Sequence, residues 1–77
     1  MISITIHMHG NLRRFMPGGT DRRATEVPEG MTVEAVLRGL GADQDTWLVA
    51  VNNATVERDT VLRGGDVLDC FEPVAAG

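Results

Sequence analysis

The sequence is poor in the residues that usually cross-link a small domain. Its 77 residues include one cysteine, Cys70, and two histidines, His7 and His9. A single cysteine excludes an intramolecular disulfide, and so few thiol and imidazole groups argue against a closed structural zinc site. The length suits one compact domain. We therefore predict a single domain with an aliphatic core, no metal and no bound cofactor.

Positive charge is also scarce. The net charge is −4, and none of the seven basic residues is a lysine. The pairs Arg13-Arg14 and Arg22-Arg23 are too short to form the basic stripe of a nucleic-acid-binding surface. We expect no nucleic-acid partner. Without lysine, the chain offers no side-chain amine for an isopeptide bond to itself.

Long apolar runs are missing as well. No stretch reaches the ~18–20 apolar residues that a membrane span requires. No basic region precedes the apolar part of residues 1–9, as it would in a signal peptide. These absences predict no membrane association and a cytoplasmic location.

The N-terminal third predicts a strand pair. Four apolar residues alternate with polar ones at Ile2, Ile4, Ile6 and Met8, which is the period of a strand with one buried face. Residues 10–20 are rich in turn signals, with one short helical turn that docks Leu12, Phe15 and Met16 on the core. Residues 22–27 follow as a second, antiparallel strand.

The middle of the chain predicts one short helix. Thr32 is a suitable N-cap, and Gly41 can end the helix in a left-handed conformation. Between them lies an apolar stripe at helical spacing, formed by Val33, Val36, Leu37 and Leu40. So short a helix is stable only when this stripe packs on a sheet.

The last third predicts three more strands. They are residues 47–51, 55–56 and 67–71, with a tight turn at Asn52-Asn53, apolar anchors at Val61 and Leu62, and a stop at Pro73. The predicted fold is α+β, a mixed sheet of four to five strands crossed by one helix. If the first and last strands are parallel central neighbours, this is a ubiquitin-like β-grasp. Residues 1–72 would form the domain and residues 73–77 a flexible C-terminal tail.

Five stretches, taken in order, form a familiar combination. They are residues 12–19, 25–27, 32–37, the pair 51–53 and 59–66, and 71–77. Together they resemble the MoaD/ThiS family of sulfur carriers. The segment Leu12-Arg13-Arg14-Phe15-Met16-Pro17-Gly18-Gly19 is similar to a turn of the molybdopterin branch, and the ending Phe71-Glu72-Pro73-Val74-Ala75-Ala76-Gly77 resembles the family's Phe-Pro-Pro-Val-x-Gly-Gly.

The resemblance implies chemistry at the last residue. An activating enzyme would use ATP to adenylate the Gly77 carboxylate, and a sulfur donor would then displace AMP to leave a thiocarboxylate. The sulfur would pass to an accepting enzyme, such as the large subunit of a molybdopterin synthase. The chain itself would be a carrier or the small subunit of that synthase, and the molybdopterin type is favoured.

The tail also suits recognition by these partners. Phe71, Pro73, Val74, Ala75 and Ala76 are the predicted partner-binding residues. Proline fixes the direction of the chain, and small residues let the end enter a narrow channel. The family normally has glycine at the position of Ala76. One extra methyl typically costs ~1–3 kcal/mol in a tight site, which a matched enzyme with a wider channel would avoid.

Other interpretations stay open. The chain could be a β-grasp interaction module without tail chemistry, or a ubiquitin-like covalent modifier whose tail joins a partner's lysine.

Cys70 alternates into the core and is interpreted as a small buried hydrophobe. His7 and His9 are interpreted as ordinary sheet residues, although they could hold a metal together with a partner's ligands. Phe71 points outward as a docking anchor or lies under a loop.

Overall fold

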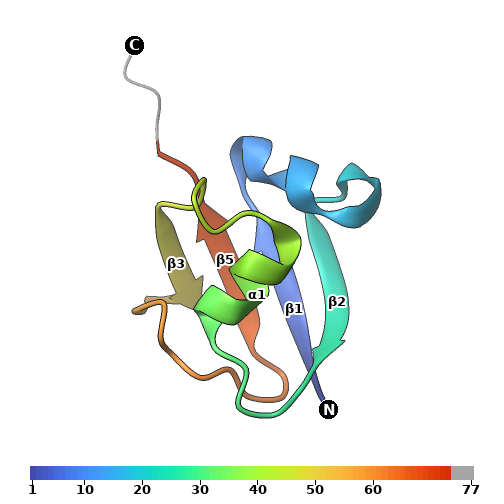
Figure 1. The fold of residues 1–77 in the computed structure, drawn as a ribbon, viewed down its shortest axis with the longest axis vertical. Helices are drawn as coiled ribbons and strands as arrows, with labels where there is room; N and C mark the ends of the chain where they lie inside the picture. Colours follow the sequence, from blue (N-terminus) through green and yellow to red (C-terminus); the bar gives the residue numbers. More distant parts are fainter. Residues whose placement is uncertain (74–77) are drawn as a thin grey trace.

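The fold is a five-stranded mixed sheet with one helix across it (Figure 1). The computed structural model describes residues 1–73. In chain order the elements are β1 (Ile2–Met8), the 3₁₀ helices η1 (Gly10–Phe15) and η2 (Pro17–Gly19), β2 (Arg22–Val27), α1 (Val33–Leu40), β3 (Leu48–Val51), β4 (Ala54–Thr55) and β5 (Val67–Phe71). The strand order is β2-β1-β5-β3-β4, and β1 and β5 are the parallel central pair. The predicted ubiquitin-like β-grasp is confirmed.

Period-two alternation builds the core as predicted. Ile4, Ile6 and Met8 of β1 are almost completely buried, and so are Leu68 and Cys70 of β5. They face α1, which covers one side of the sheet (Figure 1). The other side carries the alternate residues of each strand, so polar side chains of β1 and β5 share an uncovered face.

The helix begins and ends at the predicted caps. The Thr32 hydroxyl accepts a hydrogen bond from the Ala35 amide at 3.2 Å, and Gly41 has φ 78°. Val33, Val36 and Leu37 are buried, whereas Leu40 is partly exposed. The turn Asn52-Asn53 has positive φ at both residues, as a two-residue hairpin requires.

Two boundary predictions and one burial prediction were wrong in detail. The third strand begins at Leu48 rather than Trp47, whose side chain is 65% exposed. The short fourth strand is Ala54–Thr55, because the two-residue turn pairs Ala54 directly with Val51. Val61 is not an apolar anchor: its backbone pairs with Thr32, and its side chain points outward while the next one, Leu62, is buried.

The segment of residues 10–20 docks at one end of the sheet (Figure 1). Leu12 is fully buried and Met16 nearly so, while Phe15 packs against the core from its edge. This confirms the predicted helical turn. Its position matters because it lies at the same end of the sheet as the end of β5.

Candidate functional site

The candidate site is the place where the chain leaves the sheet after β5. Hydrogen bonds hold this end on both sides: the His9 amide donates to the Cys70 carbonyl at 3.0 Å, and the Trp47 amide donates to the Phe71 carbonyl at 2.8 Å. The strand ends at Phe71, and the exposed Pro73 follows two residues later. The root of the C-terminal segment is therefore fixed by both neighbouring strands.

Glu72 adds a third contact at this root. Its Oε2 accepts a hydrogen bond from the Asn11 amide at 2.9 Å. Gly10 leaves room for the carboxylate, because it has φ 63° and a Cβ there would lie 3.0 Å from Glu72 Cδ. The MoaD/ThiS ending usually has proline where this chain has Glu72. The glutamate ties the root to η1, which a proline could not do.

Phe71 lies on the uncovered face of the sheet. It is half-buried, and its ring stacks on the His9 ring with centroids 4.3 Å apart and an interplanar angle of 14°. It is therefore neither fully exposed nor under a loop. Its predicted role as a docking anchor, like that of Pro73, stays a prediction. Val74, Ala75, Ala76 and Gly77, the other predicted site residues, lie outside the described residues.

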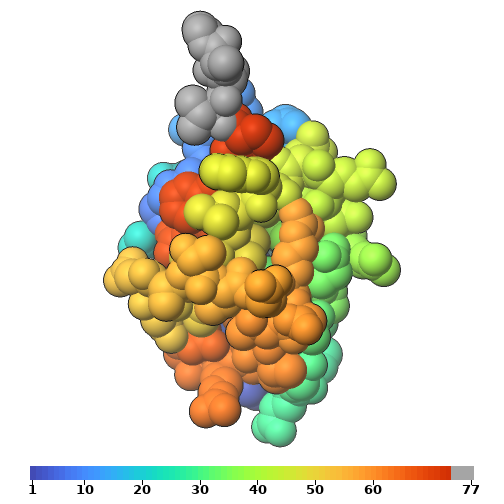
Figure 2. Space-filling model, turned by 90° about the vertical axis from the view of Figure 1, so that its left-hand side faces the viewer, coloured from blue at the N-terminus to red at the C-terminus, as the bar shows by residue number. Residues whose placement is uncertain are grey.

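Trp47 is an exposed aromatic residue that the sequence reasoning placed inside a strand. Its backbone is bonded to Phe71, so its 65%-exposed side chain lies close to the root. Figure 2 views this edge of the molecule, where the segments that follow residue 47 lie below the red end of β5. One signal could have found it: a lone tryptophan between a polar loop and a strand is a candidate contact residue.

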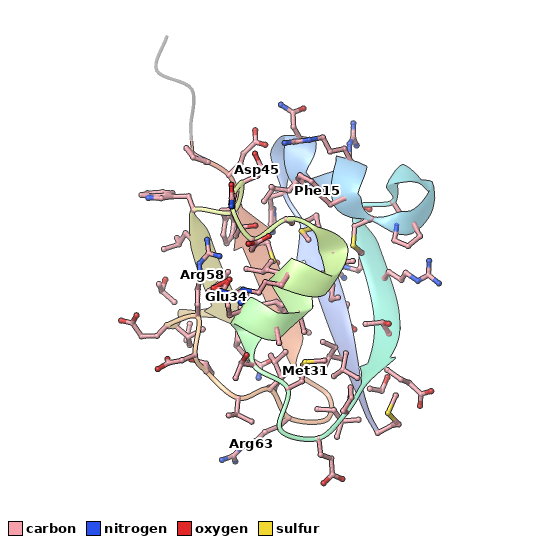
Figure 3. The ribbon with its side chains drawn as sticks, in the orientation of Figure 1. Phe15, Met31, Glu34, Asp45, Arg58 and Arg63 are labelled. Carbon is pink, nitrogen blue, oxygen red and sulfur yellow. The ribbon has the colours of Figure 1, made fainter. Side chains whose placement is uncertain are left out.

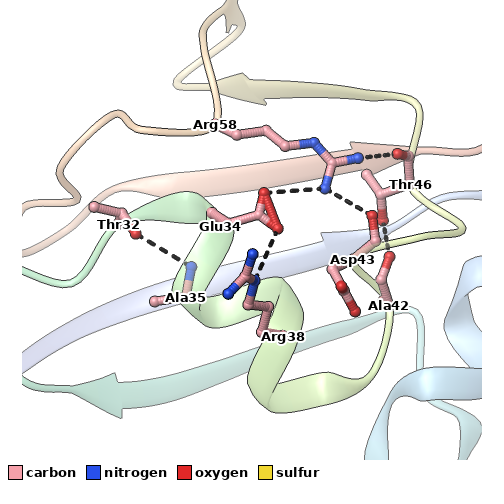
Figure 4. A network of polar contacts seen from close by, with 8 residues as sticks. All are labelled: Thr32, Glu34, Ala35, Arg38, Ala42, Asp43, Thr46 and Arg58. Carbon is pink, nitrogen blue, oxygen red and sulfur yellow. Dashed lines mark hydrogen bonds and ion pairs between the residues drawn. The ribbon is translucent and has the colours of Figure 1, made fainter.

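The Arg58 guanidinium fixes the loop that leads to Trp47 (Figures 3 and 4). It donates to the Asp43 carbonyl at 2.7 Å and also to the Thr46 carbonyl. It lies 3.5 Å from Glu34 in the first turn of α1. One side chain thus links the start of the helix to the loop beside the root.

Cys70 is buried, as predicted, and is fully inaccessible. Burial, and to a smaller extent the neighbouring Asp69 carboxylate, raises the pKa of its thiol from 9.0 to about 12. The nucleophilic thiolate is therefore scarce near neutral pH. The thiol beneath the root is a packing group, which leaves the C-terminal segment as the candidate carrier of sulfur.

Asp69 is a neighbour of the two histidines that the sequence reasoning missed. Its Oδ1 lies 3.0 Å from His7 Nδ1 and 2.9 Å from His9 Nε2. The pairing of β1 with β5 brings them together, with His7 directly opposite Asp69. The sequence held one signal for this contact, namely that the first and last strands were expected to be parallel neighbours. The register between them was not predicted.

The ThiS family model matches residues 7–77. The chain belongs to the ThiS family. Its β-grasp fold, with the matched region extending through the candidate tail, agrees with this membership. Proteins of this MoaD/ThiS-like group are small ubiquitin-like sulfur carriers rather than enzymes, and they work with activating enzymes and sulfur-accepting partners.

Solved structures share the fold over almost the whole chain. A Pyrococcus furiosus protein assigned as molybdopterin converting factor subunit 1 has a TM-score of 0.77 and 22% identity, covering 96% of this chain and 100% of that one. Small archaeal modifier protein 1 from Haloferax volcanii has a TM-score of 0.76 and 20% identity, covering 96% and 100%. The solution structure of the HVO 2177 protein, also from Haloferax volcanii, has a TM-score of 0.78 and 24% identity, covering 99% and 87%.

No curated protein matches this sequence. Within residues 1–73, none of the helices has the length and apolar character needed to cross a membrane.

Proposed function

We propose that this ThiS-family chain carries sulfur as a thiocarboxylate on Gly77. The observation that carries the proposal is the family match, which includes the whole segment from the end of β5 to residue 77. The root of that segment supports it: three hydrogen bonds hold Cys70, Phe71 and Glu72, and the exposed Pro73 follows them.

The proposed reaction needs no catalytic group from the carrier. A partner activating enzyme transfers AMP from ATP to the Gly77 carboxylate and releases pyrophosphate. Sulfide displaces AMP to give the thiocarboxylate directly. Where the donor is a persulfide, its outer sulfur displaces AMP to give an acyl disulfide, and a second thiol of the donor then cleaves the S–S bond, which releases the thiocarboxylate and leaves the donor as a disulfide. The carrier contributes a recognisable surface and an end without a β-carbon next to the reacting carbon. Because the partner enzyme uses the ATP, ATP is a substrate of that enzyme and not a cofactor of this chain.

We favour the molybdopterin type of carrier. The segment of residues 12–19, which resembles that branch, lies within η1 and η2 beside the root. The similarity in fold to the assigned molybdopterin converting factor subunit from Pyrococcus furiosus agrees with this choice. In that case the accepting partner is the large subunit of a molybdopterin synthase, which receives the tail.

The test is an adenylation assay with a candidate activating enzyme from the same organism. Pyrophosphate exchange into ATP should depend on the carrier. Deletion of Gly77 should abolish the exchange while the thermal unfolding temperature stays unchanged, because the core lies within residues 1–73. Exchange that is equally fast without Gly77 would contradict the proposal. Ala76→Gly should change the rate by less than about tenfold, as expected for a channel that already accepts one methyl group.

A covalent modifier is the second candidate. The likeness in fold to small archaeal modifier protein 1 favours it. It predicts that tryptic digestion of cell extracts leaves residues 64–77, the segment after the last arginine, attached to lysines of other proteins. Because this chain has no lysine, every such remnant would mark a true acceptor and none would come from chains joined to one another through lysine. A carrier without conjugation predicts no remnants but an intact thiocarboxylate.

A further inference from the structure

Two histidines and one carboxylate converge on the uncovered face of the sheet. His7 and Asp69 are directly opposite on β1 and β5, and His9 follows two residues after His7, on the same face. One nitrogen or oxygen donor from each of the three residues lies within 4.8 Å of the others. The shortest separations are the 2.9 and 3.0 Å from Asp69 Oδ1 to the two ring nitrogens.

These two separations are hydrogen-bond lengths, and each is about 0.4–0.5 Å shorter than the spacing of donors around a metal ion, so the side chains must move slightly apart to admit one. Around a tetrahedral Zn²⁺ with bonds of about 2.0–2.2 Å, donor atoms stand about 3.4 Å apart. Two imidazole nitrogens and one carboxylate oxygen form a donor set that suits Zn²⁺ and its neighbours in the first transition series. We propose that His7 Nδ1, His9 Nε2 and Asp69 Oδ1 bind one such divalent ion.

The donors are held in place before any ion arrives. The side chains of His7, His9 and Asp69 are only 21, 34 and 13% exposed. The two imidazole rings pack with centroids 4.1 Å apart, and the His9 ring is also stacked on Phe71. Donors on paired strands with packed rings lose little freedom when they bind an ion.

A second carboxylate can orient one of the ligands. Asp21 Oδ2 lies 4.0 Å from His7 Nε2, the ring nitrogen that faces away from Asp69. When Nδ1 binds the ion, Nε2 carries the proton and faces this carboxylate, which is the usual arrangement around a metal-bound histidine. Three protein donors leave a fourth position on the ion for water.

One cation opposes the ion. Arg22 Nη2 lies 3.4 Å from His7 Nδ1. Arg22 is exposed and can turn into solvent, but its charge weakens binding. The proposal therefore predicts changes of opposite sign at two adjacent residues: removing the charge of Arg22 strengthens binding, and removing that of Asp21 weakens it.

The site is independent of the chemistry proposed for Gly77. It uses only residues of β1 and β5, His9 directly after β1, and the start of β2 with its preceding turn, and each proposal can fail without the other. Because the proposed metal site lies beside Phe71, the free coordination position of the ion would be on the same face as the root of the C-terminal segment.

The experiment is calorimetric titration of the untagged full-length chain with Zn²⁺. We expect saturable binding of one ion, lost in His9→Asn and Asp69→Asn. Glu26→Gln, which removes an equal charge from exposed β2, should bind as the unmodified chain does. Arg22→Gln should bind several-fold more tightly, and Asp21→Asn about tenfold more weakly. Absence of saturable binding, or unchanged binding in Asp69→Asn, would overturn the proposal.

Nitrogen NMR of the imidazoles tests the same site without any substitution. The chain has only two histidines, so both ring signals belong to the site. On addition of Zn²⁺ the His7 Nδ1 and His9 Nε2 signals should move to the values of metal-bound nitrogen. Imidazole nitrogen signals that do not shift at a saturating concentration of Zn²⁺, or a shift that shows His7 bound through Nε2, would contradict the assigned geometry.

Discussion

At the scale of single residues, the most informative side chain is that of Cys70, which has no role in the proposed sulfur transfer. Cys70 is the only thiol in the chain and lies directly beneath the candidate site. Its burial removes it from the list of sulfur carriers, and the sheet uses it as a small apolar residue. Sulfur transfer is proposed instead at the terminal carboxylate of Gly77.

The raised pKa of Cys70 predicts how stability depends on pH. The unfolded thiol loses its proton above about pH 9, whereas the folded one keeps it to about pH 12. The contribution of this thiol to the free energy of unfolding should therefore be constant below about pH 9 and fall by roughly 1.4 kcal/mol per pH unit above it. The chain has no lysine and no tyrosine, so no other side chain ordinarily titrates in this window.

Urea unfolding between pH 8.5 and about pH 10.5 measures this slope, a range below the point at which arginine titrates. Cys70→Ala is the matched control, because it removes the thiol and leaves every charged residue in place. It should be less stable at pH 8 but show no slope. An identical slope in both proteins would show that the thiol is not the group responsible.

At the scale of elements, α1 depends on contacts outside itself. Its eight residues are too few for a stable isolated helix. Thr32 and Gly41 close its ends, Glu34 pairs with Arg38 one turn later at 3.5 Å, and Arg58 joins this pair to the following loop (Figure 4). The helix, the loop and the position of Trp47 are thus held by one network.

Replacing Arg58 with alanine should weaken this network measurably. Hydrogen bonds from charged donors contribute ~1.5–3 kcal/mol when buried, but the Arg58 side chain is 32% exposed and water will replace part of the loss. We expect a decrease of about 1–3 kcal/mol in the free energy of unfolding, measured with urea. Arg63→Ala, which removes an exposed arginine, should change it by less than about 0.5 kcal/mol. Equal effects would contradict the account of the network.

The elements also show what local sequence could predict. Alternation in β1, the cap at Thr32 and the positive-φ turn at Asn52-Asn53 are encoded within a few residues, and all were predicted. Trp47 and Val61 were not, because apolar character alone does not tell which way a side chain points in a short or irregular stretch.

Local sequence patterns could not predict the contacts of the candidate site, because they join residues that are far apart in the chain. Asp69 meets His7 and His9 only through the register between two strands that are sixty residues apart in sequence. Glu72 meets Asn11 across a similar separation of sixty-one. Such pairs follow from the tertiary fold, and a resemblance to a family predicted the ending of the chain but not these particular partners.

At the scale of the whole molecule, the sheet has two different faces. One is covered by α1 (Figure 1), and the other carries Phe71, which is stacked on His9 beside the root of the C-terminal segment. A partner that takes the tail must approach this end of the sheet. The half-buried Phe71 and the exposed Trp47 are the aromatic groups closest to that path among residues 1–73.

Removing the Phe71 ring should therefore impair recognition by the activating enzyme. We expect Phe71→Ala to lower kcat/KM for adenylation more than about tenfold, mainly through KM, because aromatic anchors contribute much of the binding energy of interfaces. Val61→Ala removes an exposed apolar side chain elsewhere and should leave kcat/KM unchanged. Equal kinetics in the two variants would show that Phe71 is not an anchor.

The central claim concerns a single carboxylate, and intact-mass spectrometry tests it most directly. After incubation with its activating enzyme, ATP and a sulfur donor, the chain should gain the mass difference between one sulfur and one oxygen atom. Fragmentation should place that gain on Gly77, and the chain lacking Gly77 should show none. A chain that keeps its original mass with an activating enzyme shown to adenylate another carrier, or one that gains a whole sulfur atom on Cys70 as a persulfide and shows no change at Gly77, would contradict the account.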